Sequence, residues 1–166
     1  MNERADTATI ERARTGDRAA QRALYERLET RLAALPGVLA VEPLRMVPVR
    51  VRSGSRYRET VLTAHPSGAS LRRVIEHPLR VVSIPSEGIV VSDVLARALG
   101  VGVGDRIVVE PLEGERAPRE ARIVGTTTEM LGLAVHASLR TVEALFDEEP
   151  LVTAGLLRVD PARSAE

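Results

Sequence analysis

The feature that most constrains the fold is a Val-rich run at residues 38–52, VLAVEPLRMVPVRVR, which two prolines interrupt. Val favours extended backbone, whereas Pro43 and Pro48 cannot donate a ladder hydrogen bond and confine a strand to an edge or a bulge. The run therefore predicts one long, bent strand. Ser53-Gly54-Ser55 has the composition of a turn, so residues 56–64 are predicted to pair back as a hairpin.

A helix is predicted ahead of this strand. Asp17 has the side chain of an N-cap, and apolar residues then recur at helical spacing until Pro36-Gly37 ends the pattern. The apolar positions are Ala20, Leu24, Leu28, Leu32 and Leu35. Arg and Glu fill the positions between them, which indicates an amphipathic helix over residues 17–35 with one face packed on the core.

Shorter patterns predict the remaining elements. The predicted strands are 6–12, 79–84, 89–91, 106–112, 119–128 and 153–160; the predicted helical segments are 69–76, 93–99 and 138–147, and Glu129 to Val135 is predicted to be a loop around Gly132. Ser92 or Asp93 would cap the helix that ends at Leu99. Strands that cluster in hairpins between helices indicate an α+β protein rather than a βαβ array.

The glycine-rich run at residues 100–105, GVGVGD, invites comparison with a dinucleotide-binding loop. Its spacing is G-x-G-x-G, and it follows a helix and precedes a strand, which is the reverse of the order that cradles a phosphate. Gly100 is instead expected to end the helix, and Gly104-Asp105 to form a tight turn into the next strand.

Composition excludes several kinds of chemistry. All 23 basic residues are Arg, so the chain has neither a Walker A lysine nor a Schiff-base lysine, and it has no Cys. The 23 Asp and Glu residues balance the 23 Arg, with no basic excess of the kind that binds nucleic acid. One Phe, two Tyr and no Trp leave little for stacking on sugars or bases.

The sequence offers no pattern typical of a catalytic centre. His65, His77 and His136 lie far apart with no metal-ligand spacing, and no G-x-S-x-G elbow occurs. We therefore expect no catalytic, cofactor-binding or metal-binding residues and no enzymatic activity. The residues expected to matter are structural turn and cap positions: Pro36, Gly37, Gly88, Ser92, Gly100, Gly104, Asp105 and Gly132.

The order of several short motifs resembles that of a known family. The motifs are Leu35-Pro36-Gly37-Val38, Val41-Glu42-Pro43, Ile84-Pro85, Gly88-Ile89, Ser92, Leu95-Ala96, Leu99-Gly100-Val101, Gly104-Asp105, Met130-Leu131-Gly132-Leu133 and Leu156 to Asp160. In this order they resemble the extracytoplasmic domain of ABC transporter permeases of the FtsX-like, MacB/LolC type. Residues 1–30 match this pattern loosely, and His136 stands where relatives often carry small residues and an aromatic.

The resemblance implies a non-catalytic domain at the extracytoplasmic face of a bacterial plasma membrane, inserted between two membrane helices. It implies a porter-like α/β lobe built from residues 1–64 and 136–166 and a mainly-β lobe from residues 65–135. ATP hydrolysis would belong to a separate ATP-binding subunit or domain. Partners would be an extracytoplasmic protein or a lipid or lipoprotein cargo, with no cofactor and no nucleic acid.

Two spatial expectations follow from the implied insertion between membrane helices. The segment 6–12 and the strand near 153–160 should lie side by side, because both chain ends would return to one surface. The other lobe should bury apolar side chains of the predicted strands and short helix, namely Ile89, Val91, Leu95, Leu99, Ile107 and Val109.

Two other interpretations remain open. Residues 88–125, which include Leu95-Ala96, Leu99-Gly100-Val101 and Gly104 to Val109, also resemble the strand entry of double-psi β-barrel modules that recognise substrates or cofactors. That resemblance leaves the helix at 17–35 and the final strand unexplained. A free-standing interaction domain is the third interpretation.

Overall fold

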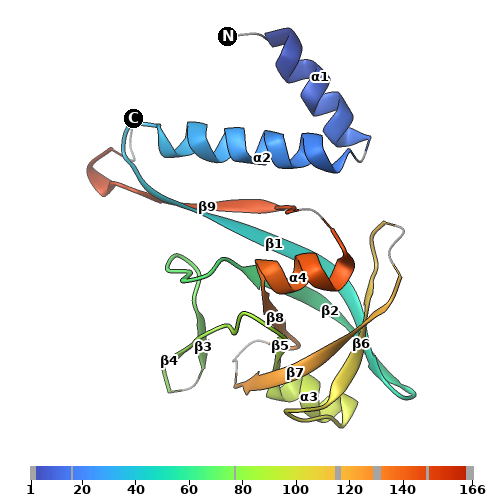
Figure 1. Ribbon diagram of the computed structural model, residues 1–166. Coiled ribbons are helices and arrows are strands. Elements are labelled where there is room, and N and C mark those ends of the chain that lie inside the picture. The colour runs from blue at the N-terminus through green and yellow to red at the C-terminus, as the bar shows by residue number, and fades with distance from the viewer. Residues whose placement is uncertain are drawn as a thin grey trace.

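The computed structural model describes residues 3–15, 17–76, 78–114, 117–128, 132–148 and 150–163. Figure 1 shows a strand-rich body with a helical layer at the end where both chain termini lie. The elements in chain order are α1 (Glu3–Arg14), α2 (Arg18–Ala33), β1 (Val38–Ser53), β2 (Arg56–His65), β3 (Val74–Glu76), β4 (Arg80–Val82), β5 (Ile89–Ser92), α3 (Asp93–Leu99), β6 (Arg106–Pro111), β7 (Arg119–Thr127), β8 (Val135–Ser138), α4 (Leu139–Phe146), β9 (Ala154–Val159) and a 3₁₀ turn (Pro161–Arg163). The α+β class predicted from the sequence is confirmed.

Six strands close into a barrel. The main sheet runs β2-β8-β5-β7-β6-β1-β9, and β1 also pairs with β2, so the first six strands of that order form a ring. The β1–β2 hairpin pairs Ser53 with Arg56 around Gly54, as predicted. Two neighbouring pairs, β2 with β8 and β5 with β7, are parallel, so the barrel is mixed and is not built from hairpins alone.

The interior of the barrel is filled with aliphatic side chains. All six residues expected to be buried, from Ile89 to Val109, are fully or almost fully buried. The same cluster takes in Val49 and Leu62 from β1 and β2 and Phe146 from α4. Since these residues come from both sides of positions 65 and 135, one hydrophobic core joins segments that the sequence assigned to separate lobes.

The second part of the molecule, here called the chain-end layer, consists of α1, α2, residues 38–44 of β1, and β9. β1 is long enough to serve both parts, because its first half pairs with β9 and its second half pairs with β2 and β6. The pairing with β9 ends at Leu44, next to Pro43, and Pro48 lies just before the residues that pair with β6. The predicted long strand is confirmed.

Two predicted elements are wrong, and strand β8 was not predicted. Residues 6–12 belong to helix α1, which packs on α2 and buries Ala13, and β9 takes the first half of β1 as its strand partner instead. Alternation over seven residues cannot separate a strand from a short helix, and here packing on α2 decides. Residues 74–76 form strand β3, and Val135 begins strand β8 inside the predicted loop.

Candidate functional site

A groove of about 590 Å³ lies between α2 and the β1–β9 ribbon. Its apolar lining comes from α2, β1 and the segment before β9: Leu24, Leu28, Leu32, Val41, Pro43, Leu151 and Val152. The helix therefore does turn its leucines toward the sheet. They are not sealed in a core, however, since Leu28 keeps 47% of its surface exposed. The predicted core helix is thus only partly packed.

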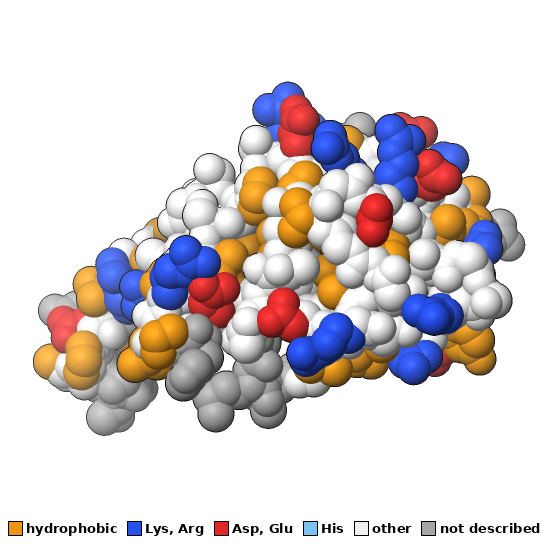
Figure 2. All heavy atoms as spheres, turned by 90° about the horizontal axis from the view of Figure 1, so that it is seen from below, with side chains coloured by type: hydrophobic (Ala, Val, Ile, Leu, Met, Phe, Trp, Pro, Cys, Tyr) orange, Lys and Arg blue, Asp and Glu red, His pale blue; other side chains and the backbone are white. Residues whose placement is uncertain are grey.

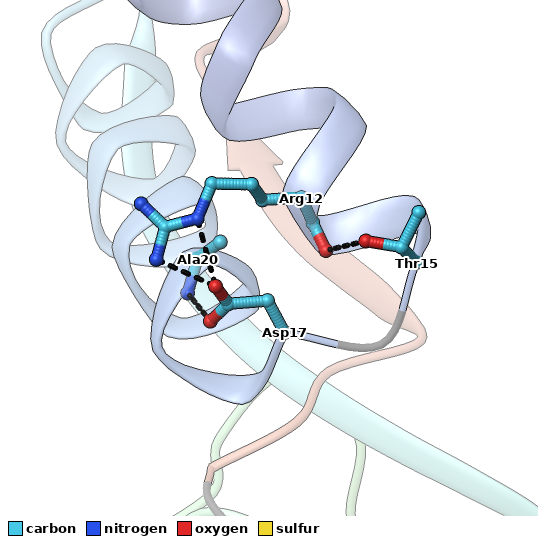
Figure 3. Close-up of polar contacts among 4 residues, drawn as sticks. All are labelled: Arg12, Thr15, Asp17 and Ala20. Atoms are coloured by element: carbon cyan, nitrogen blue, oxygen red, sulfur yellow. Dashed lines mark hydrogen bonds and ion pairs between the residues drawn. The ribbon is translucent and has the colours of Figure 1, made fainter.

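The junction of α1 and α2 fixes the two helices to each other. Asp17 accepts a hydrogen bond from the Ala20 N–H at 3.0 Å, so it is the predicted N-cap. Its other oxygen accepts from Arg12 Nε at 2.8 Å, while the Thr15 hydroxyl donates to the Arg12 carbonyl (Figure 3). The Ala20 N–H and the Arg12 guanidinium lower the pKa of Asp17. A single carboxylate therefore starts one helix and ties it to the preceding one.

Two polar pairs border the apolar lining of the groove. The Tyr25 hydroxyl donates to the Glu29 carboxylate, and burial together with that carboxylate raises the pKa of Tyr25. Arg45 Nε lies 3.4 Å from Glu148 Oε1, and the two side chains are only 11% and 1% exposed. Because breaking a buried ion pair leaves a charge uncompensated, this pair holds β1 to the segment after α4.

The opposite face of the ribbon is covered by the segment that follows β2. Glu42 accepts from the Ser70 N–H and hydroxyl, both at 2.7 Å, and from the Leu71 N–H at 2.9 Å. Burial raises the pKa of Glu42, but these hydrogen bonds outweigh burial and lower it overall. The β1–β9 ribbon, which forms one side of the groove, is therefore held in place by these hydrogen bonds. Helix α2, which forms the other side, is more loosely packed.

The structural residues predicted from the sequence lie elsewhere, mostly at turns of the barrel. Ser92 caps α3 by accepting from the Leu95 N–H, and Gly100 ends that helix in the left-handed region. Positive φ angles also occur at Gly37, Gly88, Gly104 and Gly132. These positions shape the fold and do not form one site.

Two of these predicted positions connect separate segments. Gly104 donates to the carbonyl of Ile123, and Asp105 accepts from the Gly102 N–H, so the turn after α3 is fastened to β7. The carbonyl of Gly37, which follows Pro36, accepts from the Asp160 N–H at 2.7 Å. That bond joins the start of β1 to the end of β9.

Two of the three histidines meet in space. His65 Nε2 and His136 Nδ1 are 3.2 Å apart, and both side chains are buried between β2 and β8. His77 lies outside the described residues. No group of three or more His, Asp or Glu residues suited to a metal ion occurs among the residues that were placed.

The sequence did not single out the groove as a site. The regular leucine spacing of α2 looks the same whether the helix is buried or leaves its apolar face half open. On the face in Figure 2, positive and negative side chains are interspersed, with no broad area of one sign, so this face offers no charged site.

Comparison with known proteins identifies the fold. No protein-family model matches the sequence, and no curated protein matches it significantly. The structure is similar to the extracellular domain of the noncanonic ABC-type transporter YknZ from Gram-positive bacteria, with a TM-score of 0.55 and 14% identity over 82% of this chain and 73% of that one. It is also similar to the periplasmic region of MacB from Actinobacillus actinomycetemcomitans, with a TM-score of 0.50 and 12% identity over 82% of this chain and 65% of that one.

The described residues contain no helix that is long and apolar enough to cross a membrane. The similarity to YknZ and MacB extends over most of the chain. This protein has the fold of the extracytoplasmic domains of MacB-type ABC transporters.

Proposed function

We propose that this chain is the non-catalytic extracytoplasmic domain of an ABC transporter permease, and that it contacts cargo or a partner protein and couples that contact to membrane helices. The observation that carries the proposal is the fold match over 82% of the chain to two such domains. ATP hydrolysis would then belong to a separate ATP-binding subunit or domain. The cargo would be a lipid or lipoprotein, or the partner an extracytoplasmic protein.

The arrangement of the molecule supports a direction relative to the membrane. Both chain termini lie at the end that carries the chain-end layer, whereas α3 and the turn that follows it lie at the opposite end (Figure 1). We infer that the chain-end layer faces the bilayer and that residues 65–135 belong to the distal part, except for the segments at Ser70-Leu71 and Glu113, which lie against the chain-end layer. A lobe boundary at 65 and 135 stays a prediction, because the barrel core is shared across it.

The location can be tested by labelling, because the chain contains no Cys. Ser55 is exposed in the β1–β2 turn, and Ala64 is fully buried in the barrel. In the full-length protein in bacterial cells, Ser55→Cys should react with a membrane-impermeant maleimide, and Ala64→Cys should not. Reaction of Ser55→Cys only after cell lysis would place the domain in the cytoplasm and contradict the proposal.

The absence of catalysis is tested separately. The purified 166-residue chain should show no ATP turnover above a boiled control. Turnover that a point substitution within the chain abolishes would show an active site and overturn this part of the proposal.

A recognition module related to double-psi barrels is the second candidate function. It is favoured by the closed ring of six strands and by the Gly104-Asp105 turn, which is fastened to β7 within that ring. The barrel interior is filled by side chains, so a ligand of such a module would bind outside the ring. The labelling experiment separates the candidates, because a cytoplasmic module would be labelled only in lysed cells.

A further inference from the structure

We propose that a small pocket beside the barrel binds a doubly charged oxyanion, such as sulfate, phosphate or the phosphate group of an ester, and that binding draws a proton from solvent onto the buried His65–His136 pair. The pocket is separate from the groove beneath α2. It is lined by His65, at the end of β2, and by residues of the segment 66–84 that follows β2. The proposal does not depend on the transporter function.

The two histidines lie on the outer face of the barrel. Side chains alternate along a strand, and Ala64 of β2 belongs to the barrel core, so His65 faces outward. Ala137 of β8 places His136 on the outer face in the same way. Both histidines are nevertheless buried, with 1% and 6% of their surface exposed. The segment 66–84, which supplies the rest of the pocket lining, therefore covers an outer face that carries polar side chains.

The histidine pair can take up one proton without losing its hydrogen bond. His65 Nε2 and His136 Nδ1 are 3.2 Å apart, so one of these nitrogens donates and the other accepts. A cationic imidazole still donates to a neutral one, whereas two cationic imidazoles would set two donors against each other. Burial opposes even the first added charge unless an opposite charge lies nearby. A bound anion would supply that charge.

Two arginines give the pocket its positive charge. Arg72 and Arg73 both line it, and neither has a carboxylate partner among the residues that the structure describes. Glu42 of β1 holds the backbone of this segment through the N–H groups of Ser70 and Leu71, and it does not line the pocket. Guanidinium groups donate in a planar fork that matches the oxygens of phosphate or sulfate. A fixed backbone with two such side chains suits a compact dianion.

The size and the walls of the pocket limit the ligand further. Its volume of about 210 Å³ is below the roughly 300–1,000 Å³ of clefts that enclose drug-sized ligands. The pocket therefore suits a small ion or the charged end group of a larger molecule. The other lining residues are small, apolar or uncharged: Pro66, Gly68, Ala69, Val74, Val81, Val82, Ser83 and Ile84. None of the described lining residues is acidic, and apolar walls strengthen the attraction between an anion and the arginines.

The groups around the histidine pair determine the direction of the coupling. Its neighbours in the sheet, Val90 of β5 and Ser138 of β8, do not titrate. The charged groups on this side are the two arginines of the covering segment and Glu42, whose carboxylate is occupied by hydrogen bonds from that segment. The arginines oppose a further positive charge on the pair, and a bound dianion removes that opposition. The anion-bound protein thus holds more protons, so the anion should bind more tightly as the pH falls.

Titration calorimetry of the purified 166-residue chain with sodium sulfate tests the proposal. Sulfate keeps its charge over the range in which an imidazole titrates, so a change in affinity reports on the protein. We expect saturable one-to-one binding that weakens about fivefold from about pH 5.5 to about pH 8. Titrations at about pH 6.5 in two buffers of different ionisation enthalpy count the protons exchanged, and net uptake is expected.

Substitution of the two arginines tests the site. Arg72→Gln combined with Arg73→Gln should weaken sulfate binding about tenfold or more, because it removes charged hydrogen-bond donors. Arg97→Gln combined with Arg119→Gln is the matched control. It removes the same charge at two exposed positions outside the pocket and should bind sulfate as wild type does. Melting curves identify any variant that is unfolded.

Substitution of the two histidines tests the coupling. His65→Gln combined with His136→Asn keeps polar side chains but removes both imidazoles, so sulfate affinity should no longer change with pH. If this variant does not fold, proton uptake by the wild type still decides. Inorganic phosphate and glycerol 3-phosphate, compared at one pH, distinguish a free ion from an ester as the preferred ligand. No saturable sulfate binding, binding unaffected by the paired arginine substitutions, or binding without proton uptake would each overturn the proposal.

Discussion

The barrel and the chain-end layer are built from the same kinds of residue but reach different degrees of packing. In the barrel, a closed ring of strands surrounds aliphatic side chains that are almost fully buried. In the chain-end layer, a two-stranded ribbon and a helix face each other across an open groove. A strand ring encloses its interior completely, whereas a helix on a ribbon has two open sides. Stability should therefore be concentrated in the barrel and adaptability in the layer.

The largest expected effect of a single substitution lies in the barrel. Leu62 is fully buried within the main cluster, so Leu62→Ala leaves a cavity among rigid strands. We expect the free energy of unfolding to fall by about 2–5 kcal/mol. Urea unfolding followed by circular dichroism measures the change. A loss below about 1 kcal/mol would mean that the barrel repacks easily and that the contrast with the chain-end layer is wrong.

Gly88 and Gly104 test how closely the turns of the barrel are packed. A Cβ at Gly88 would lie 2.9 Å from the Arg122 carbonyl oxygen and 2.5 Å from a Val124 methyl group, whereas a Cβ at Gly104 would meet nothing within 4 Å. Both residues have positive φ. Gly104→Ala should therefore cost only the backbone strain of about 1–2 kcal/mol, and Gly88→Ala should cost more. Melting temperatures of the two variants test the order, and equal losses would contradict it.

The same contrast decides what the sequence could predict. The barrel strands other than β8 were predicted because β-branched runs alternate with Gly and Pro turns, and the burial of Ile89 to Val109 followed from that pattern. The long strand β1 was found as well, but its double pairing was not, because nothing local in Pro43 or Pro48 says which partner each half takes. The local sequence pattern also did not predict that α1 is a helix, because its helical structure depends on packing against α2.

The groove was beyond sequence reasoning for a related reason. The leucines of α2 show where a helix turns its apolar side, but the amount of surface that the opposing ribbon covers depends on how wide the ribbon is. Here the ribbon ends at β9, so Leu28 stays nearly half exposed. The His65–His136 contact could not be predicted from the sequence either. The two histidines are 71 residues apart, and only the parallel pairing of β2 with β8 brings them together.

In the chain-end layer, truncation of an apolar side chain should cost less than in the barrel. Leu28 has 47% of its surface exposed, so Leu28→Ala loses only part of the burial energy of a full leucine. We expect a loss of about 1 kcal/mol, since complete burial is worth roughly 1.5–3 kcal/mol. Urea unfolding followed by circular dichroism measures it. A loss as large as that of Leu62→Ala would show that α2 is part of the main core.

The smallest expected effect concerns Glu42, which links the layer to the segment after β2. Hydrogen bonds from Ser70 and Leu71 lower the pKa of Glu42 in the folded protein, below the unfolded value of 4.5. The unfolded chain therefore binds the proton more readily than the folded chain does. The contribution of Glu42 to stability is present above about pH 4.5 and is lost as the pH falls through the lower, folded pKa.

Glu42→Gln isolates this contribution, because the amide keeps one accepting oxygen but carries no charge. The variant should be less stable than wild type at pH 7, and the difference should shrink as the pH falls below 4.5. Urea unfolding of both proteins across that range measures it. Glu59→Gln is a matched control, because Glu59 pairs with Arg50 on an exposed part of the β1–β2 hairpin. A difference between Glu42→Gln and wild type that stays constant down to acidic pH would show that the Glu42 side chain acts through its shape and not through its charge.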